Sequence, residues 1–318
     1  MDGDRLQPQS RSGFRRNDRL LVRPYLIQSD KQLRVAAYQA PLLPAASTEL
    51  ALSFIRERVE WCESEGVEIL CCPEGVLGGL ADYAPRPMAF AIDVEGGQLH
   101  TALAPLASNR VTTIVGFTER ASRGRLFNSA AVFHRGSVIG VYRKLYPAIN
   151  KSVYTAGDKM PVFTVGDLTF GIVICLDSTY YEPARIMAAQ GAAALFVPTN
   201  SGMPPPRGGP ELPAEARNKD IARAVENGVS VVRADVVGRT SDLVSYGSSG
   251  IVGRSGIVLG AAQRLEAGLV VADIKTAPRE PRPGWDASRN PAVASEYAQL
   301  VARAFAITEH STDVTKSV

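Results

Sequence analysis

The chain has 318 residues, of which 45% are hydrophobic and 21% charged, and its 35 Lys and Arg residues exceed its 32 Asp and Glu residues to give a net charge of +3. This length and composition exclude a wholly disordered chain, a collagen-like repeat and a small disulfide scaffold. The sequence has no run of about 18 apolar residues, which a membrane helix needs. Its four cysteines are too few to stabilise a chain of this length by disulfide bonds. We therefore expect a cytoplasmic protein with no membrane partner.

The first 30 residues differ in composition from the rest of the chain. They contain six arginines and four aspartates, so they contribute +2 of the net charge of +3. Because the basic excess lies in this segment, the remaining chain gives no reason to expect a nucleic-acid partner. We expect residues 1–30 to form a poorly ordered, Arg-rich leader, as termini without anchoring contacts often do.

From residue 33 onward, short apolar runs alternate with amphipathic stretches, which is typical of an α/β protein. Predicted strands in the first half lie at 33–39, 67–72, 111–118, 130–133 and 137–142. Predicted helices lie at 48–66 and 98–108, and Pro105 is expected to disturb the second of them. The residues between the last two strands, 134–136, indicate a tight hairpin turn.

The second half repeats this alternation. Its predicted strands lie at 168–174, 193–197, 229–234, 249–253, 257–261 and 269–274, and its predicted helices at 182–190 and 215–227. A loop rich in Pro and Gly at 201–213 is expected to form a pocket rim or lid. The last three strands follow one another without helices, so we expect the second half to end in hairpins.

The sequence shows no linker between the two halves, which favours one large domain with two layered halves. We place this domain at residues 31–275. Residues 276–318 are expected to form a Pro-rich arm followed by a C-terminal helix that begins near Asn290.

Three potentially reactive side chains, Glu74, Lys144 and Cys175, each come just after an apolar strand-like run. In open α/β folds, sites form beyond the carboxyl ends of strands, so these side chains are expected to converge. A thiol with a pKa of about 8.5 is only slightly ionised at neutral pH and needs a neighbouring base or cation.

These residue types suit nucleophilic catalysis. Glu74 could take the proton of Cys175 and later activate water. Lys144 could stabilise an oxyanion together with the backbone amide of Leu176, and its charge is expected to favour the thiolate. The expected intermediate is a thioester between Cys175 and an acyl group.

Three sequence blocks, at 70–74, 140–145 and 171–177, resemble in their order the motif blocks of the nitrilase superfamily of carbon-nitrogen hydrolases. The resemblance continues through further blocks at 182–185, 197–200, 222–228 and 247–251, and it covers about residues 33–275. It implies a four-layer α-β-β-α sandwich in a homodimer or higher homo-oligomer. It also implies a Glu-Lys-Cys site that needs no cofactor or metal.

Carried over by position, Glu74 is the general base, Lys144 the oxyanion stabiliser and Cys175 the nucleophile. The other three cysteines match no catalytic position and are expected to be structural. Many amidase-type members have a second glutamate after the lysine, but this sequence has none between Leu145 and Ile174. We consider Asn150 a candidate substitute.

Two further features bear on the substrate. True nitrilases typically follow the cysteine with Trp-Glu, whereas Cys175 is followed by Leu176 and Asp177, which is closer to amidases and carbamoylases. Asn200 and Arg207 are candidate substrate-binding residues, and Arg207 could bind a substrate carboxylate.

The sequence therefore predicts a hydrolase that cleaves the carbon-nitrogen bond of a small linear amide or N-carbamoyl (ureido) compound. Nitrile hydrolysis and amide acyl transfer are alternatives. A catalytically silent binding module of the same fold is a third alternative, suggested by the missing second glutamate.

Overall fold

The structure, a computed structural model, describes residues 31–148, 152–205, 207–278, 291–293 and 295–299. The predicted leader at 1–30 lies outside the described residues, and so does Asn150. Residues 291–293 and 295–299 are helical, in agreement with the predicted C-terminal helix, whose remaining residues are not described. The division of the chain at residues 30 and 275 stays a prediction.

Within the described residues, strands form a nine-stranded and a six-stranded sheet. The first sheet contains β1 (Gln32–Pro41), β2 (Ile69–Cys71), β3 (Ile92–Asp93), β4 (Thr112–Arg120), β5 (Leu126–His134), β6 (Ser137–Arg143), β11 (Val236–Arg239), β12 (Val244–Tyr246) and β15 (Gly268–Lys275). Its main order is β12-β11-β1-β2-β4-β5-β6, with β15 also paired to β1 and β3 to β4.

The second sheet contains β7 (Val162–Val165), β8 (Leu168–Ile172), β9 (Ala194–Pro198), β10 (Ser230–Ala234), β13 (Gly250–Val252) and β14 (Val258–Ala261). Its order is β14-β13-β10-β9-β8-β7. Strands β8, β9 and β10 run parallel, and the outer pairs are antiparallel, so this sheet is mixed.

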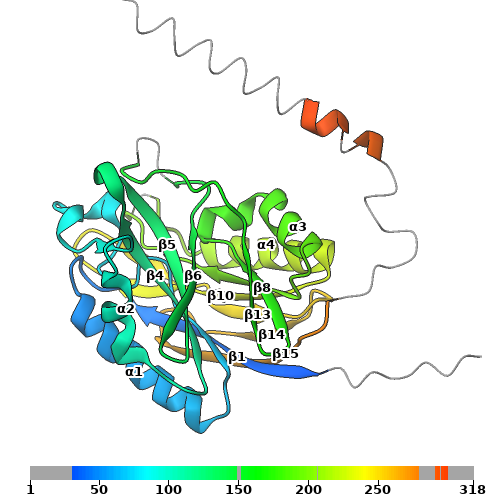
Figure 1. Ribbon diagram of the computed structural model, residues 1–318, viewed down its shortest axis with the longest axis horizontal. Coiled ribbons are helices and arrows are strands. Elements are labelled where there is room, and N and C mark those ends of the chain that lie inside the picture. Colours follow the sequence, from blue (N-terminus) through cyan, green and yellow to red (C-terminus); the bar gives the residue numbers. More distant parts are fainter. Residues whose placement is uncertain (1–30, 149–151, 206, 279–290, 294, 300–318) are drawn as a thin grey trace, which may run out of the picture. The chain divides into compact units, whose positions relative to one another are not determined.

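Helices cover the outer face of each sheet (Figure 1). On the first sheet lie α1 (Thr48–Ser64) and α2 (Gln98–Leu103), and on the second lie α3 (Tyr181–Ala189) and α4 (Leu212–Asn227). Pro105 lies in a short 3-10 turn that follows α2, as the sequence predicted. Helix α1 begins at Thr48 and buries an apolar stripe that includes Ile55 and Val59.

The two faces of strand β1 pack against different layers of the fold. Its side chains alternate between the two faces of the sheet. Ala36 and Tyr38 pack with α1, whereas Val35 and Ala37 pack in the core that joins both sheets. The same inner core contains Phe196 of β9, so the two sheets are stacked face to face. The predicted α-β-β-α sandwich is confirmed.

The hairpin between β5 and β6 is also confirmed. Arg135 and Gly136 form its two-residue turn, and both have positive φ angles, 48° and 74°. A turn with positive φ at both central positions matches the twist of the flanking strands. This hairpin places Lys144 directly after the end of β6.

The prediction that the second half ends in its own hairpins is wrong for its last strand. Strands β13 and β14 pair with each other, but β15 returns to the first sheet and pairs antiparallel with β1. The short strands β3, β7, β11 and β12 were not predicted. No described helix is long and apolar enough to cross a membrane.

Candidate active site

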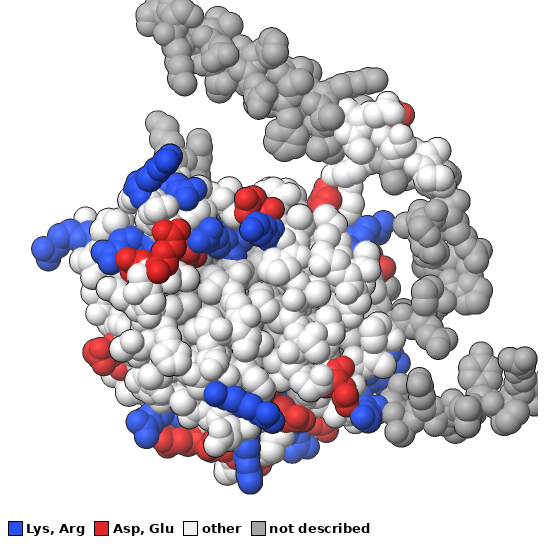
Figure 2. All heavy atoms as spheres, in the orientation of Figure 1, with Lys and Arg blue, Asp and Glu red and all other residues white. Residues whose placement is uncertain are grey.

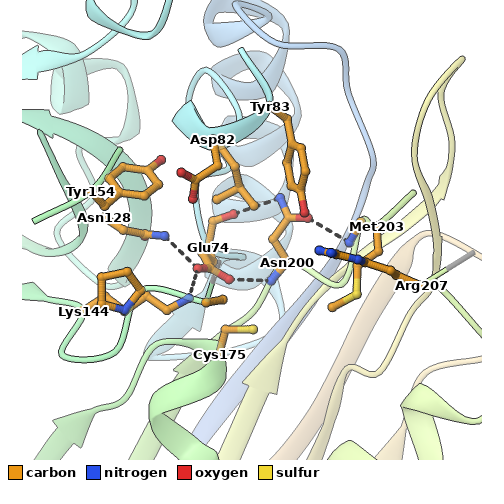
Figure 3. Close-up of a pocket in the computed structure, with 14 residues that line it drawn as sticks. Glu74, Asp82, Tyr83, Asn128, Lys144, Tyr154, Cys175, Asn200, Met203 and Arg207 are labelled. Atoms are coloured by element: carbon orange, nitrogen blue, oxygen red, sulfur yellow. Dashed lines mark hydrogen bonds and ion pairs between the residues drawn. The ribbon is translucent and has the colours of Figure 1, made fainter. Parts of the chain in front are cut away.

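A cavity of about 180 Å³ lies at the ends of β2, β6 and β8, and Glu74, Lys144 and Cys175 all line it (Figure 3). Its other described lining residues are Leu80, Asp82, Tyr83, Asn128, Pro147, Ala148, Tyr154, Asn200, Gly202, Met203 and Arg207. The structure therefore brings together the three side chains that the sequence singled out. Their chemical roles remain a prediction.

The backbone around Glu74 is held by close packing against β4. A Cβ atom at Gly116 would lie 2.3 Å from the carbonyl oxygen of Pro73 and 2.8 Å from the Cα atom of Glu74. Only glycine allows this approach without a shift of one of the two segments. The Glu74 amide also donates to the carbonyl of Thr199 at 3.3 Å. The turn that carries Glu74 is thus fixed to both sheets.

The Glu74 carboxylate is buried and accepts hydrogen bonds at both of its oxygens. Oε1 accepts from Lys144 Nζ at 2.5 Å and from Asn128 Nδ2 at 2.7 Å, and Oε2 accepts from the Asn200 amide at 2.9 Å. Asn200 Nδ2 further donates to the Glu74 carbonyl at 3.3 Å. These contacts fix the carboxylate in the centre of the cavity (Figure 3).

Lys144 is held through its backbone. Its amide donates to the carbonyl of Asn128 at 2.8 Å, and its carbonyl accepts from the Gly157 amide at 2.7 Å. Burial lowers the pKa of the ammonium, but the neighbouring acidic groups, above all the Glu74 carboxylate, outweigh that effect and raise the pKa above its ordinary value. Lys144 is therefore a permanent cation at the cavity wall.

Cys175 stands at a backbone bend. Strand β8 ends at Ile172, and Cys175 begins a short 3-10 helix, η5 (Cys175–Thr179), with a φ of 47°. This left-handed conformation is uncommon for a residue with a side chain and costs about 1–3 kcal/mol. The bend turns the side chain of Cys175 toward the cavity below Glu74 (Figure 3).

The pKa of the Cys175 thiol lies well above neutral pH, so the thiol is protonated. Loss of hydration and the charge of Glu74 raise its pKa to about 12, against the smaller opposing effects of Lys144 and Arg233. The expectation that Lys144 favours the thiolate has the right direction, but Glu74 and desolvation prevail. This thiol would need a proton acceptor to become a nucleophile, and the Glu74 carboxylate lines the same cavity.

Asp177 ties the nucleophile segment to the segment after Lys144. Its buried carboxylate accepts four hydrogen bonds, from the Tyr142 hydroxyl at 2.7 Å and from the amides of Ile174 at 3.1 Å, Tyr146 at 2.9 Å and Leu145 at 3.3 Å. Burial raises its pKa to about 6, and Lys144 and these donors oppose that rise. Asp177 is therefore a positioning residue for both Lys144 and Cys175.

A second buried ion pair lies close to η5. Arg233 of β10 donates to Asp220 of α4 through Nε and through Nη2, the latter at 2.5 Å. It also donates to the Ser178 hydroxyl at 3.0 Å and to the Thr199 hydroxyl at 2.7 Å. These bonds connect α4 to η5 and to the end of β9, but neither Arg233 nor Asp220 lines the cavity.

The other predicted site residues have different positions. Leu176 is the next residue after Cys175 in η5, so its backbone amide directly follows Cys175 in the chain. Asn200 lines the cavity, but its hydrogen bonds go to Glu74. Arg207 lines the cavity and is exposed, and Asn150 lies outside the described residues.

Sequence reasoning missed several lining residues, above all Asn128 and Asp82. Asn128 is a polar residue within β5, where alternation makes polar residues ordinary. Its Oδ1 atom is buried and has no hydrogen-bond partner in the described part of the chain. Asp82 accepts from the Ser152 hydroxyl at 2.9 Å and the Val153 amide at 2.8 Å. The only signal that the sequence offers for Asn128 is a polar residue within a predicted strand region near the predicted site.

The remaining cysteines are buried and free. Burial raises the pKa of Cys62 to about 12 and that of Cys71 and Cys72 further. Over the described ranges, no three His, Cys, Asp or Glu side chains are grouped so that they could hold a metal ion. On the face drawn in Figure 2, basic and acidic residues are intermixed around the edge and leave the centre free of charge.

Two stacked mixed sheets between helix layers, with a thiol, a carboxylate and an ammonium group around one cavity, define an α/β protein with a cysteine-centred candidate active site. Residues 34–280 match the carbon-nitrogen hydrolase family, and the chain belongs to this family, the nitrilase superfamily. It is a carbon-nitrogen hydrolase whose amidase, nitrilase and carbamoylase relatives are all distant.

Two relatives and one solved structure illustrate this range. The chain is 31% identical over 284 residues to an N-carbamoylputrescine amidase from Solanum lycopersicum, which covers 83% of this chain and 94% of the relative. It is 31% identical over 221 residues to a nitrilase from Pyrococcus abyssi, which covers 68% of this chain and 80% of the relative.

The solved structure is that of a mutant of the amidase from Nesterenkonia sp. AN1, and it shows the result of Michael addition of acrylamide at the active-site cysteine. It has a TM-score of 0.68 and 23% identity and covers 83% of this chain and 99% of that one. At this identity the likeness shows the fold alone.

Proposed function

We propose that this protein hydrolyses the carbon-nitrogen bond of a small linear amide or N-carbamoyl compound through an acyl-enzyme on Cys175. Glu74 serves as the general base, and Lys144 and the Leu176 amide stabilise the oxyanion. The observation that carries this proposal is the placement of Glu74, Lys144 and Cys175 on the wall of one small cavity.

The first half-reaction forms a thioester and releases the amine. The Cys175 sulfur attacks the carbonyl carbon while its proton passes to Glu74, and the carbonyl oxygen becomes an oxyanion. The oxyanion collapses, the carbon-nitrogen bond breaks, and the leaving nitrogen takes the proton from Glu74. The second half-reaction repeats these steps with water, which gives its proton to Glu74 and attacks the thioester. The departing sulfur regains the proton.

The protonation states of the site support these roles. A thiol with a pKa of about 12 is a poor nucleophile at neutral pH, so its proton must leave as the sulfur-carbon bond forms. Lys144 is permanently charged and makes one hydrogen bond through Nζ among the described residues, to Glu74. An ammonium group has three donors, so Lys144 retains donors for an oxyanion.

The residues that follow Cys175 favour amide or ureido substrates over nitriles. Cys175 is followed by Leu176 and Asp177, whereas true nitrilases typically have Trp-Glu at these positions.

The test is hydrolysis of a panel that contains acetamide, propionamide, N-carbamoyl amines and aliphatic nitriles. Cys175→Ala should lose all activity while its circular dichroism spectrum stays unchanged. Cys62→Ala removes a buried thiol of α1 instead, and it should retain activity in proportion to its folded fraction. Mass spectrometry should find an acyl adduct on Cys175 in the native chain. Full activity of Cys175→Ala would sink the proposal.

The same panel separates the alternatives. An added amine acceptor that appears in the product identifies acyl transfer, and turnover of nitriles alone identifies a nitrilase. A chain that forms no adduct and releases no product with any compound is the silent binding module.

A further inference from the structure

A second cavity, which we call the outer cavity, borders the catalytic cavity. It has a volume of about 490 Å³ and shares three wall residues, Leu80, Tyr83 and Asn200, with the catalytic cavity. Figure 3 shows Tyr83 and Asn200 at the edge of the catalytic cavity, away from Lys144. The two spaces therefore adjoin each other at these three residues.

The walls of the outer cavity divide into two kinds. The segment after β1 and the segment after η1 (Ala81–Tyr83) contribute apolar side chains that include Leu42, Pro44 and Pro85. The turn between β11 and β12 contributes Leu243 together with a polar rim that contains Arg239 and Asp242. A ligand with an apolar body and a solvated end suits such a space.

The size of the catalytic cavity limits what lies next to Cys175. Its volume of about 180 Å³ is below the roughly 300–1,000 Å³ of cavities that enclose whole drug-sized ligands. This space is sufficient for a small acyl or carbamoyl group. A larger substituent must extend out of it.

The hydrogen bonds of Glu74 indicate which substituent of the substrate extends out of the catalytic cavity. The leaving nitrogen must approach Glu74, because it takes the proton that Glu74 holds. Glu74 Oε2 is bonded to Asn200, and Asn200 belongs to the wall shared with the outer cavity. Lys144 and Asn128 bond to the other oxygen, Oε1. The Oε2 side of Glu74 is therefore the side that adjoins the outer cavity.

We propose that the outer cavity binds the amine-side substituent of the substrate. The substrate is then a secondary amide or urea in which a small acyl or carbamoyl group is joined to an extended, mainly apolar amine. This inference rests on the proposed function and adds to it the class of leaving group.

The experiment compares kcat/KM for acetamide, N-butylacetamide, phenethylurea and hexanamide. The compounds with a large amine side should exceed acetamide by at least tenfold, whereas hexanamide, which is large on the acyl side, should not. Leu243→Trp fills the outer cavity and should reduce the preference for phenethylurea over acetamide at least tenfold. Ala45→Phe, from the opposite wall, should act in the same direction if Leu243→Trp does not fold.

The matched control is Ile257→Trp, at an exposed position before β14 that is remote from both cavities. It should leave the kcat/KM of every compound unchanged. A preference that neither wall substitution alters, or equal rates for all amine substituents, overturns the assignment of the outer cavity while the proposed function stands. No turnover of any compound and no adduct on Cys175 overturns the proposed function and the substrate assignment together.

Discussion

Two ion pairs among the described residues are buried on both sides; they look alike in isolation but differ in their surroundings. Lys144 and Glu74 meet at 2.5 Å, and so do Arg233 and Asp220, and all four side chains are nearly inaccessible to solvent. The first pair lines the catalytic cavity, whereas the second does not. Arg233 donates from all three of its nitrogen atoms to described protein groups, whereas Lys144 makes one described hydrogen bond through Nζ.

The difference in unused donors distinguishes the ion pair at the candidate active site from the ion pair that links two structural elements. A buried ion pair contributes little net stability, because desolvation of both charges offsets their attraction. What it offers chemically depends on which donors and acceptors it leaves unused. The Arg233–Asp220 pair uses every guanidinium nitrogen of Arg233 and joins α4 to β10, whereas the Glu74–Lys144 pair retains donors beside the thiol. Burial and distance alone would not distinguish them.

The largest expected effect tests this distinction by neutralising each pair. Lys144→Met should lower kcat at least 10²–10³-fold, the usual cost of losing one oxyanion donor. Arg233→Met should instead lower the free energy of unfolding by about 3 kcal/mol, because the buried Asp220 then keeps only the more distant Arg217, whose Nη1 lies 3.6 Å from Oδ2. Denaturant unfolding and kcat measured on the folded fraction report the two effects.

The matched double variants sharpen the comparison. Arg233→Met with Asp220→Asn should recover stability, with kcat of the folded fraction unchanged throughout. Lys144→Met with Glu74→Gln should recover stability but no activity. Recovery of activity by the second double variant would contradict the catalytic role of the pair.

The next largest effect tests how precisely the Glu74–Lys144 pair must be positioned for activity. Gly116→Ala puts a methyl group 2.3 Å from the Pro73 carbonyl and must shift the turn that carries Glu74. A displacement of about 1 Å costs roughly 10²-fold in rate, so kcat should fall by that order. Gly268→Ala is the control, because its added Cβ meets no atom within 4 Å. Equal kcat values for the two variants would show that the turn does not need this close packing.

A smaller effect tests Asp177, another buried carboxylate, which has no ion-pair partner in the described chain. Its pKa of about 6 means that acid removes an acceptor that positions Lys144 and Cys175, so activity should fall as the pH drops through that region. The Tyr142 hydroxyl lowers this pKa. Tyr142→Phe should therefore raise it and move the acid limb of the kcat/KM profile to higher pH.

The control for this shift is Tyr38→Phe, which alters a buried tyrosine of β1 away from the cavity. Its acid limb should coincide with that of the native chain. An unmoved limb in Tyr142→Phe assigns the acid limb to another group.

The smallest effect concerns the strained backbone at Cys175. Glycine adopts a φ of 47° without the steric cost that a side chain incurs. Cys175→Gly should therefore unfold at a free energy about 1 kcal/mol higher than Cys175→Ala, although both are inactive. Thermal and urea unfolding of the two variants measure the difference. A more stable alanine variant would show that the bend carries no strain.

The strand ends were predictable from the sequence, because apolar runs that stop at Pro73 or Cys175 have a clear local pattern. That pattern located Glu74, Lys144 and Cys175 at positions that the structure places around one cavity. Their chemical roles rest on the resemblance and on the proposed experiments.

Other features depend on contacts between distant segments and left no local signal. Nothing near Cys175 in the sequence indicates a left-handed backbone at a residue with a side chain. Asn128 lies in the middle of β5, and its proximity to Glu74 depends on the pairing of β4 with β5. The apolar run of β15 predicted a strand but could not indicate which sheet it joins.

The pairing of β15 with β1 has a consequence for synthesis on the ribosome. Eight residue pairs join 32–39 to 268–275, so one edge of β1 stays open until more than 200 further residues have been made. At about 5–20 residues per second, that wait lasts on the order of 10–50 s. An unpaired strand edge is a template for association with other chains. Nascent chains of this protein therefore need protection from one another until the last strand of the sheet emerges.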